Sequence, residues 1–333
     1  EAVLGYILLD DPDPETTLKP GSIPCPDRDN DTDSDFFDNP GNNCGGVYLN
    51  RLPEKNFRTG QLRDASNENL WYAISPEFRS GNPQAVNSLT PATLSIDDKG
   101  DYVAVILAPG NPLPNQSRID PTIRTDFLEG PKASIPPKFI STSTDAFNDR
   151  LIGISHKEWE DAVVRRVANE VLKKLTAFKT KQGFFPPPAA LTTAPTRSLS
   201  SGQNISEGFL PVDQLWPAPE VPITKEKKNA DWFAQNEWYK LIYYVLAPAF
   251  KEKNVLGNCD DPAQCLILRN SGVETTRIKA LVIFAGRPLA GQNRNTTNSV
   301  AAFLEGEENT DGDNTFELPA PGSTSNDRFY IIK

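Results

Sequence analysis

The chain has 333 residues and a formal net charge of −10 at pH 7, with 44 acidic and 34 basic side chains. This balance argues against a nucleic-acid partner, because phosphate binding requires clustered lysine and arginine. No stretch approaches the 18 or more apolar residues of a membrane-spanning helix. The length allows a large core and two domains, while 30 prolines and 21 glycines predict many loops and turns.

The chain is predicted to open on the end of a helix. Glu1–Leu9 has the character of the last turns of a helix cut short, with no initiator methionine and no signal peptide. We therefore expect a mature or trimmed form whose beginning has been removed. A polar loop leads on to Pro24-Cys25-Pro26, and a strongly acidic segment then covers Asp27–Asp38.

Carboxylates alternate along this acidic segment as they do in a calcium-binding loop. Hard oxygen ligands spaced two residues apart can converge on one Ca²⁺ ion, and repulsion between close carboxylates favours a counter-ion. An EF-hand would carry glycine where Thr32 stands, so a solvated acidic loop is the alternative. The candidate ligands are Asp27, Asp29, Asp31, Asp33 and Asp35.

A second candidate calcium loop lies near the C-terminus, around Gly312. Its ligands would be Asp311, Asp313 and Glu317, because they again place carboxylates at close spacing. An Asp-Gly-Asp sequence is also typical of a turn, which is the alternative interpretation of this segment.

The four cysteines fall into two close pairs, Cys25 with Cys44 and Cys259 with Cys265. Neither pair has the Cys-x-x-Cys spacing of zinc and redox sites, so we expect two local disulfides. Disulfides persist in oxidising compartments, and the protein is therefore expected outside the cytoplasm.

An apolar strand is predicted at Tyr102–Ala108 and a long amphipathic helix at Ser155–Lys181. The serine that begins the helix forms a capping box with Glu158, and apolar residues follow at the helical period. Gly183 and three prolines after it end the helix. A connection rich in Pro, Ser and Thr then runs from 186 to about 228, and loops of this length are often functional.

Segments of the second half repeat segments of the first half at a nearly constant offset. The matched pairs are Trp71–Phe78 with Tyr243–Phe250, Val103–Arg118 with Leu281–Arg294, Phe127–Gly130 with Phe303–Gly306, and Asn148–Arg150 with Asn326–Arg328; Glu1–Leu4 also aligns with Asn169–Leu172. Four ordered matches of this kind indicate an internal duplication.

The expected fold class is α+β, with two tandem units, each a long helix packed on a small antiparallel sheet with Pro/Gly-rich loops. An antiparallel sheet is favoured because the strand runs alternate with Pro/Gly turns rather than with further helices. The first unit is expected to cover residues 1–154, with its helix truncated. The second is expected to cover residues 155–333, with the Pro-rich insertion at about 186–228.

Three segments together carry a family resemblance: Ile23–Asp27, Val103–Arg118 and Phe147–Ile154. With the long helix and the acidic run, they resemble the large, duplicated minor subunits of the bacterial type IV pilin and pseudopilin superfamily. The resemblance covers most of the chain. It implies a subunit whose helix packs in a filament core while its head faces outward.

The resemblance also implies an N-terminal apolar helix that anchors the subunit in the membrane, and this sequence lacks it. Glu1–Leu9 is where that anchor would join. The implied partners are other pilins or pseudopilins, and the implied location is the bacterial cell surface or periplasm. A membrane contact is expected only through the missing helix.

Catalysis is not expected. His156 is the only histidine, so a catalytic triad would have to use it, and the cysteines are expected to be paired. Many acidic residues always offer carboxylate pairs, but no spacing selects one for glycoside hydrolysis. There is no Gly-rich phosphate loop.

Aromatic residues concentrate in the second half, where Trp232, Trp238 and Tyr239 are candidate binding residues. Exposed, they would form a sugar-binding or protein-binding surface; the alternative is that they pack in the core. The repeated Asn-Asp-Arg motif is expected to fix a turn in each unit through an Asp–Arg pair.

The first functional hypothesis is a non-catalytic minor pilin or pseudopilin, a structural or tip subunit of a type IV pilus or type II secretion pilus. The second is a calcium-dependent surface adhesin or substrate-binding module that recognises a surface ligand or glycan. The third, a secreted hydrolase, requires turnover that depends on one specific carboxylate.

Overall fold

The structure is a computed structural model that describes residues 3, 20–34, 44–114, 116–121, 123–129, 138–142, 147–202, 205–217, 232–251, 258–294, 298–320 and 325–333. The chain divides into two compact units. Unit 1 comprises Glu1–Val163 and Ile223–Trp232, and unit 2 comprises Val164–Pro222 and Phe233–Lys333. None of the helices in the described ranges is long and apolar enough to cross a membrane.

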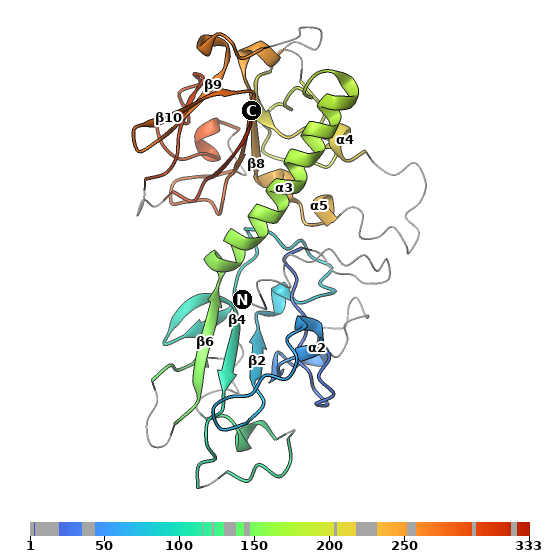
Figure 1. Ribbon diagram of the computed structural model, residues 1–333, viewed down its shortest axis with the longest axis vertical. Helices are drawn as coiled ribbons and strands as arrows, with labels where there is room; N and C mark the ends of the chain where they lie inside the picture. Colours follow the sequence, from blue (N-terminus) through green and yellow to red (C-terminus); the bar gives the residue numbers. More distant parts are fainter. Residues whose placement is uncertain are drawn as a thin grey trace. The chain divides into compact units, whose positions relative to one another are not determined.

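Unit 1 is built on a six-stranded sheet around the long strand β4, which Figure 1 shows between β2 and β6. Its strands are β1 (Leu49–Arg51), β2 (Trp71–Ile74), β3 (Leu94–Ile96), β4 (Lys99–Ala108), β5 (Lys138–Phe139) and β6 (Arg150–Ser155). β4 pairs antiparallel with β2, β3 and β6, and β1 pairs antiparallel with β2. Only β5 is parallel to its neighbour, β3.

Unit 2 has a four-stranded sheet in the order β13-β11-β8-β7 and a three-stranded sheet in the order β10-β9-β12. Figure 1 shows β9 and β10 side by side. The strands are β7 (Glu207–Phe209), β8 (Ile242–Leu246), β9 (Leu266–Asn270), β10 (Val273–Ile278), β11 (Ala280–Phe284), β12 (Thr315–Glu317) and β13 (Arg328–Ile332).

The two units share one pairing scheme. β7, β8, β9, β12 and β13 correspond to β1, β2, β3, β5 and β6, while β10 and β11 together correspond to the single long strand β4. Trp71 lies opposite Leu107, and their counterparts Tyr243 and Ile283 lie opposite each other. The parallel pair β3–β5 recurs as β9–β12. Because register is specific, this agreement means that the matched segments take the same places in the two sheets.

The short helices mark turns between strands. They are α2 (Glu54–Phe57), α4 (Val212–Leu215) and α5 (Trp232–Gln235), with the 3₁₀ turns η1 (Cys44–Gly46), η2 (Pro76–Phe78), η3 (Arg124–Asp126), η5 (Trp238–Leu241), η6 (Pro248–Phe250), η7 (Pro262–Gln264) and η8 (Val300–Ala302). Two of these turns recur with the duplication: η6 follows β8 as η2 follows β2.

The one long helix among the described residues is α3 (His156–Gln182), and its predicted capping box is confirmed. The Glu158 carboxylate accepts hydrogen bonds from the Ser155 N–H at 2.9 Å and from its hydroxyl at 2.7 Å. In return the Ser155 hydroxyl accepts the N–H of Glu158 at 3.2 Å. At the other end, Gly183 has a φ of 83° and its N–H donates to Lys179, which ends the helix as expected.

The expected fold class is wrong. Every described helix other than α3 has four residues at most, apart from the lone helical residue Val3, and the chain is rich in sheet rather than built on two long helices. The expectation failed because the repeat led us to expect, in the first half, a counterpart of the long amphipathic helix of the second half. The segment on which that expectation depended, Glu1–Leu9, lies outside the described residues except for Val3.

One hydrophobic cluster of unit 1 lies on one face of its sheet. Alternate residues of β2 and β4 reach that face, because successive side chains of a strand point to opposite sides. The cluster consists of Leu49, Trp71, Ala73, Leu94, Ile96, Val105, Leu107, Phe127, Leu128 and Phe139. In unit 2, every residue of β8 and β11 is buried, as are Val164, Val167, Val171 and Leu175 of α3.

One of the two expected disulfides is formed, between Cys25 and Cys44. The other is not, because Cys259 and Cys265 are both free and buried thiols. Each directs its sulfur to a main-chain carbonyl, that of Ile278 for Cys259 and that of Asp261 for Cys265. Burial, together with contact with Cys265, raises the pKa of the Cys259 thiol to about 12.

Candidate functional site

The acidic loop of unit 1 is organised around Asp27, which is only 1% exposed. Its two carboxylate oxygens accept the backbone N–H groups of Asn30 at 2.7 Å and Thr32 at 2.9 Å. Asn30 and Thr32 both have positive φ angles, 66° and 78°, so the chain curls round the carboxylate. Two main-chain hydrogen bonds with Arg51 fix the start of the loop to the end of β1.

Asp29 and Asp31 complete the only cluster of three potential metal ligands in the described part of the chain. One oxygen each from Asp27, Asp29 and Asp31 lie within 4.8 Å of one another. Asp33 lies next to this group but its carboxylate pairs with Lys55 at 3.5 Å. Asp35 is outside the described residues. The structure thus brings together three of the five predicted ligands.

The electrostatics of the cluster favour a cation. Burial, assisted by the negative charges of Asp31 and Asp29, raises the pKa of Asp27 to about 6, against the lowering effect of its two N–H donors. Three carboxylates at this separation repel one another, and a divalent ion would remove the repulsion. Hard carboxylate oxygens match calcium and magnesium better than zinc or copper.

Arg51 lies under the loop and was not singled out by the sequence. Its guanidinium stacks on the rings of Trp71, at 4.2 Å, and Phe127, at 4.1 Å. It donates to the main-chain oxygens of Asn69 at 3.2 Å and Pro121 at 3.1 Å. Burial lowers the pKa of Arg51 to about 10, while Glu68 and Asp27 act in the opposite direction. Arg51 therefore joins the acidic loop to the core.

The second candidate calcium loop is not assembled as a metal site among the described residues. Asp311 accepts the N–H of Asp313 at 3.1 Å, and Asp313 in turn accepts the N–H of Thr315. The backbone of Glu317 donates to Asn309 at 2.7 Å. These local hydrogen bonds are typical of a turn, which was the alternative interpretation.

The candidate aromatic surface is largely interior. Trp238 is fully buried and lies 6.4 Å from Phe284, and Tyr239 is 6% exposed. Trp232 is half-buried. Trp238 and Tyr239 thus pack in the core, the alternative that the sequence left open. His156 is buried too, beside the rings of Phe78 and Trp159.

The repeated Asn-Asp-Arg motif belongs to a polar cluster that the sequence analysis did not assemble. In unit 1, Asp149 accepts the N–H of Glu129 at 2.9 Å, and the Glu129 carboxylate accepts the side-chain amide of Gln116. Arg118 donates to the main-chain oxygens of Asp126 and Gly110. The motif thus fixes the loop after β4 to the start of β6.

Unit 2 repeats these hydrogen bonds. Asp327 accepts the N–H of Glu305 at 2.8 Å, and Glu305 accepts the amide of Gln292 at 2.9 Å. Arg294 donates to the main-chain oxygens of Ala302 and Gly286. Every one of these residues lay inside or beside a matched repeat, so the duplication itself was the signal that pointed to the cluster.

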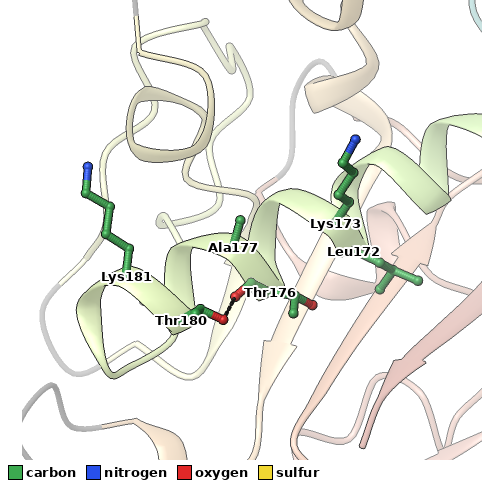
Figure 2. A pocket seen from close by; sticks show the side chains of 6 residues that line it. All are labelled: Leu172, Lys173, Thr176, Ala177, Thr180 and Lys181. Carbon is green, nitrogen blue, oxygen red and sulfur yellow. Dashed lines mark hydrogen bonds between the residues drawn. The ribbon is translucent and has the colours of Figure 1, made fainter.

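The exposed side of α3 carries a shallow groove of about 570 Å³ (Figure 2). Figure 2 shows Lys173, Ala177 and Lys181 projecting together, with Thr176 and Thr180 on the adjacent side of the helix. The Thr180 hydroxyl donates to the main-chain oxygen of Thr176 at 2.9 Å, so its polarity is partly satisfied within the helix. The groove therefore offers small, weakly polar side chains between two lysines.

Comparison with known proteins identifies no relative of this chain. Neither the family models, nor the curated proteins, nor the solved structures give a match to the chain.

Proposed function

We propose that this chain is a non-catalytic structural subunit of a bacterial surface filament, of the minor pilin or pseudopilin kind, placed at or near the filament tip. The observation that carries the proposal is the two-sided character of α3. One side of the helix is buried within the protein, and the other bears the groove between Lys173 and Lys181. A helix with a second, uncovered side is suited to packing against another subunit.

The groove suits a helix of a neighbouring filament subunit as its occupant. Ala177, Thr176 and Thr180 are small and exposed, so a second helix would approach closely along this side. The lysine stems would cover apolar surface while their charges stay at the rim. In this role the protein works outside the cytoplasm, in agreement with the Cys25–Cys44 disulfide.

Incorporation into filaments tests the assembly role. Ala177→Arg places a long cation in the middle of the groove, and we expect at least a tenfold drop in the protein that co-sediments with sheared filaments. Val273→Arg is the matched control, because Val273 is 69% exposed elsewhere in unit 2. Equal incorporation of Ala177→Arg and wild type would contradict the assembly role. Labelled protein spread along the whole shaft would contradict the tip position.

A second proposed function is calcium-dependent binding to a surface ligand or glycan, favoured by the convergence of Asp27, Asp29 and Asp31. Their carboxylates would supply ligands to one Ca²⁺ ion, with main-chain oxygens and water as further ligands. The ion would fix the shape of an exposed loop, and loops positioned by a rigid scaffold are common binding elements.

Calorimetric titration of the EGTA-treated chain with calcium tests this second function. We expect one site, lost in Asp29→Asn/Asp31→Asn and retained in Asp311→Asn/Asp313→Asn. Binding to glycans or surfaces should then require calcium. If the first double variant binds calcium as wild type does, the loop is only a solvated acidic segment.

A further inference from the structure

Asp327, a buried carboxyl group immediately before β13, lies beside the half-buried carboxyl group of Glu305. Asp327 is 5% exposed and accepts the N–H of Glu305. The Glu305 carboxylate accepts hydrogen bonds from the Gln292 amide at 2.9 Å, the Ser325 hydroxyl at 2.9 Å and the Asn326 N–H at 3.1 Å. All of these donors are neutral, so none of them offsets the charge of Glu305.

The cations beside this pair are engaged with main-chain oxygens. The guanidinium of Arg294 donates to four carbonyl groups, those of Ala285, Gly286, Ala302 and Phe303. Arg328 directs one N–H to the oxygen of Asn326 at 3.1 Å. Meanwhile Oδ1 of Asp327 is buried and makes no hydrogen bond. Full ionisation would therefore place two close negative charges in a buried site, which is costly.

We propose that Glu305 and Asp327 form a proton-dependent latch, in which one proton on the pair holds β13 in place and loss of that proton releases it. The proton sits on Asp327 and occupies its otherwise unpartnered oxygen. With the proton present, Asp327 keeps the loop after β11 attached to the first residue of β13 through the N–H of Glu305. Without it, repulsion between the two carboxylates acts directly on that contact.

The direction of the pH response follows from the burial of Asp327. Burial, together with the charge of Glu305, raises the pKa of Asp327 to about 8, although the N–H of Glu305 and the charge of Arg294 act in the opposite direction. The closed latch keeps a proton that the open state loses, so the latch weakens as the pH rises from about 4 to about 8 and does not weaken further above pH 8. Release of β13 would uncover the edge of β11, and an uncovered strand edge is a template for pairing with another chain.

Hydrogen exchange followed by mass spectrometry tests the latch in the full chain between pH 6 and 9.5. After correction for intrinsic exchange, protection of the β13 amides in wild type should fall by up to about tenfold per pH unit as the pH rises from 6 to about 8, and should level off above pH 8, where the closed and open states are both ionised. Asp327→Asn cannot ionise, so its β13 protection should not change with pH. Asp149→Asn alters the equivalent position of unit 1 and should leave the β13 profile as in wild type.

Two results would overturn the latch: constant β13 protection in wild type between pH 6 and pH 8, or an equal loss over that range in wild type and Asp327→Asn. Carboxyl-carbon NMR titration of the wild type gives a measurement that does not depend on whether the variants fold. The latch requires a protonated Asp327 at pH 7. Ionised signals for both Glu305 and Asp327 at pH 6 would refute it.

Discussion

Units 1 and 2 have the same strand pairing but differ at one structural position. In unit 1, the main chain of Asp27 pairs with that of Arg51, and in unit 2, Ala189 pairs in the same way with Phe209. A buried acid and a buried arginine in one unit thus correspond to two apolar residues in the other. The sheet accepts either pair, so its fold does not require the charged one.

The comparison extends to the phenylalanine below each pair. Arg51 stacks on Phe127 at 4.1 Å, while Phe209 packs edge-on against Phe303, the repeat counterpart of Phe127, at 5.0 Å. An aromatic ring in unit 2 therefore takes the place of the guanidinium in unit 1. Since the apolar arrangement suffices for packing, the charged arrangement favours a role beyond stability, and it lies beside the proposed calcium loop.

The largest expected effect comes from removing the ring of Phe209, the apolar side chain that takes the place of Arg51 in unit 2. Phe209→Ala leaves a cavity over Phe303, and we expect a loss of about 3–5 kcal/mol in the free energy of unfolding. Denaturant titration measures it, with Val273→Ala as an exposed control that should change stability by less than about 0.5 kcal/mol. A loss below about 1 kcal/mol would show that Phe209 is not the packing counterpart of Arg51.

The next effect tests whether unit 1 accepts the apolar pair. Arg51→Ala leaves Asp27 and the oxygens of Asn69 and Pro121 without their buried partner, and should cost about 2–4 kcal/mol. Asp27→Ala/Arg51→Phe copies unit 2 and should be more stable than Arg51→Ala by more than about 1 kcal/mol, because neighbouring changes couple. A double variant no more stable than the single one would mean that the two units pack differently here.

Much of the fold was predictable because the sequence repeats. The capping box at Ser155 and the end of α3 at Gly183 follow from local patterns, and the matched segments indicated which strands would recur. The parallel pair β3–β5 was not predictable, because strands of three and two residues leave no periodicity to detect. The free thiols of Cys259 and Cys265 show that close spacing in sequence does not determine bonding.

The candidate site was predictable only in part. Alternating aspartates indicated the loop, yet nothing in their spacing shows that Asp27 is buried while Asp29 and Asp31 are exposed. Asp27 is held against the sheet by main-chain hydrogen bonds with Arg51, which is far away in the sequence and carries no motif. Extending the repeat by one segment would have helped, because it aligns Pro24-Cys25-Pro26-Asp27 with the three prolines and Ala189 that follow α3.

A smaller effect concerns protons at the acidic loop. The pKa of Asp27 is raised to about 6 from an ordinary value of 3.8, so without calcium the folded state keeps a proton that the unfolded state loses. Stability in EGTA should therefore fall as the pH rises from about 4 to about 6. Calcium competes with that proton, and its affinity should fall up to tenfold per pH unit below pH 6. Asp27→Asn should abolish both trends, whereas Asp311→Asn should leave them unchanged.

The smallest effect tests α3, which begins in unit 1 and continues into unit 2. Ser155→Ala removes the hydroxyl that accepts the N–H of Glu158 and should cost about 1 kcal/mol. The N-terminal turns of α3 belong to unit 1 and the groove belongs to unit 2. Amide exchange in the first turns and incorporation into filaments therefore report on different parts of the helix. We expect faster amide exchange in the first turns of α3 and unchanged filament incorporation. A loss of incorporation matching that of Ala177→Arg would show that assembly depends on the stability of the whole helix rather than on its groove.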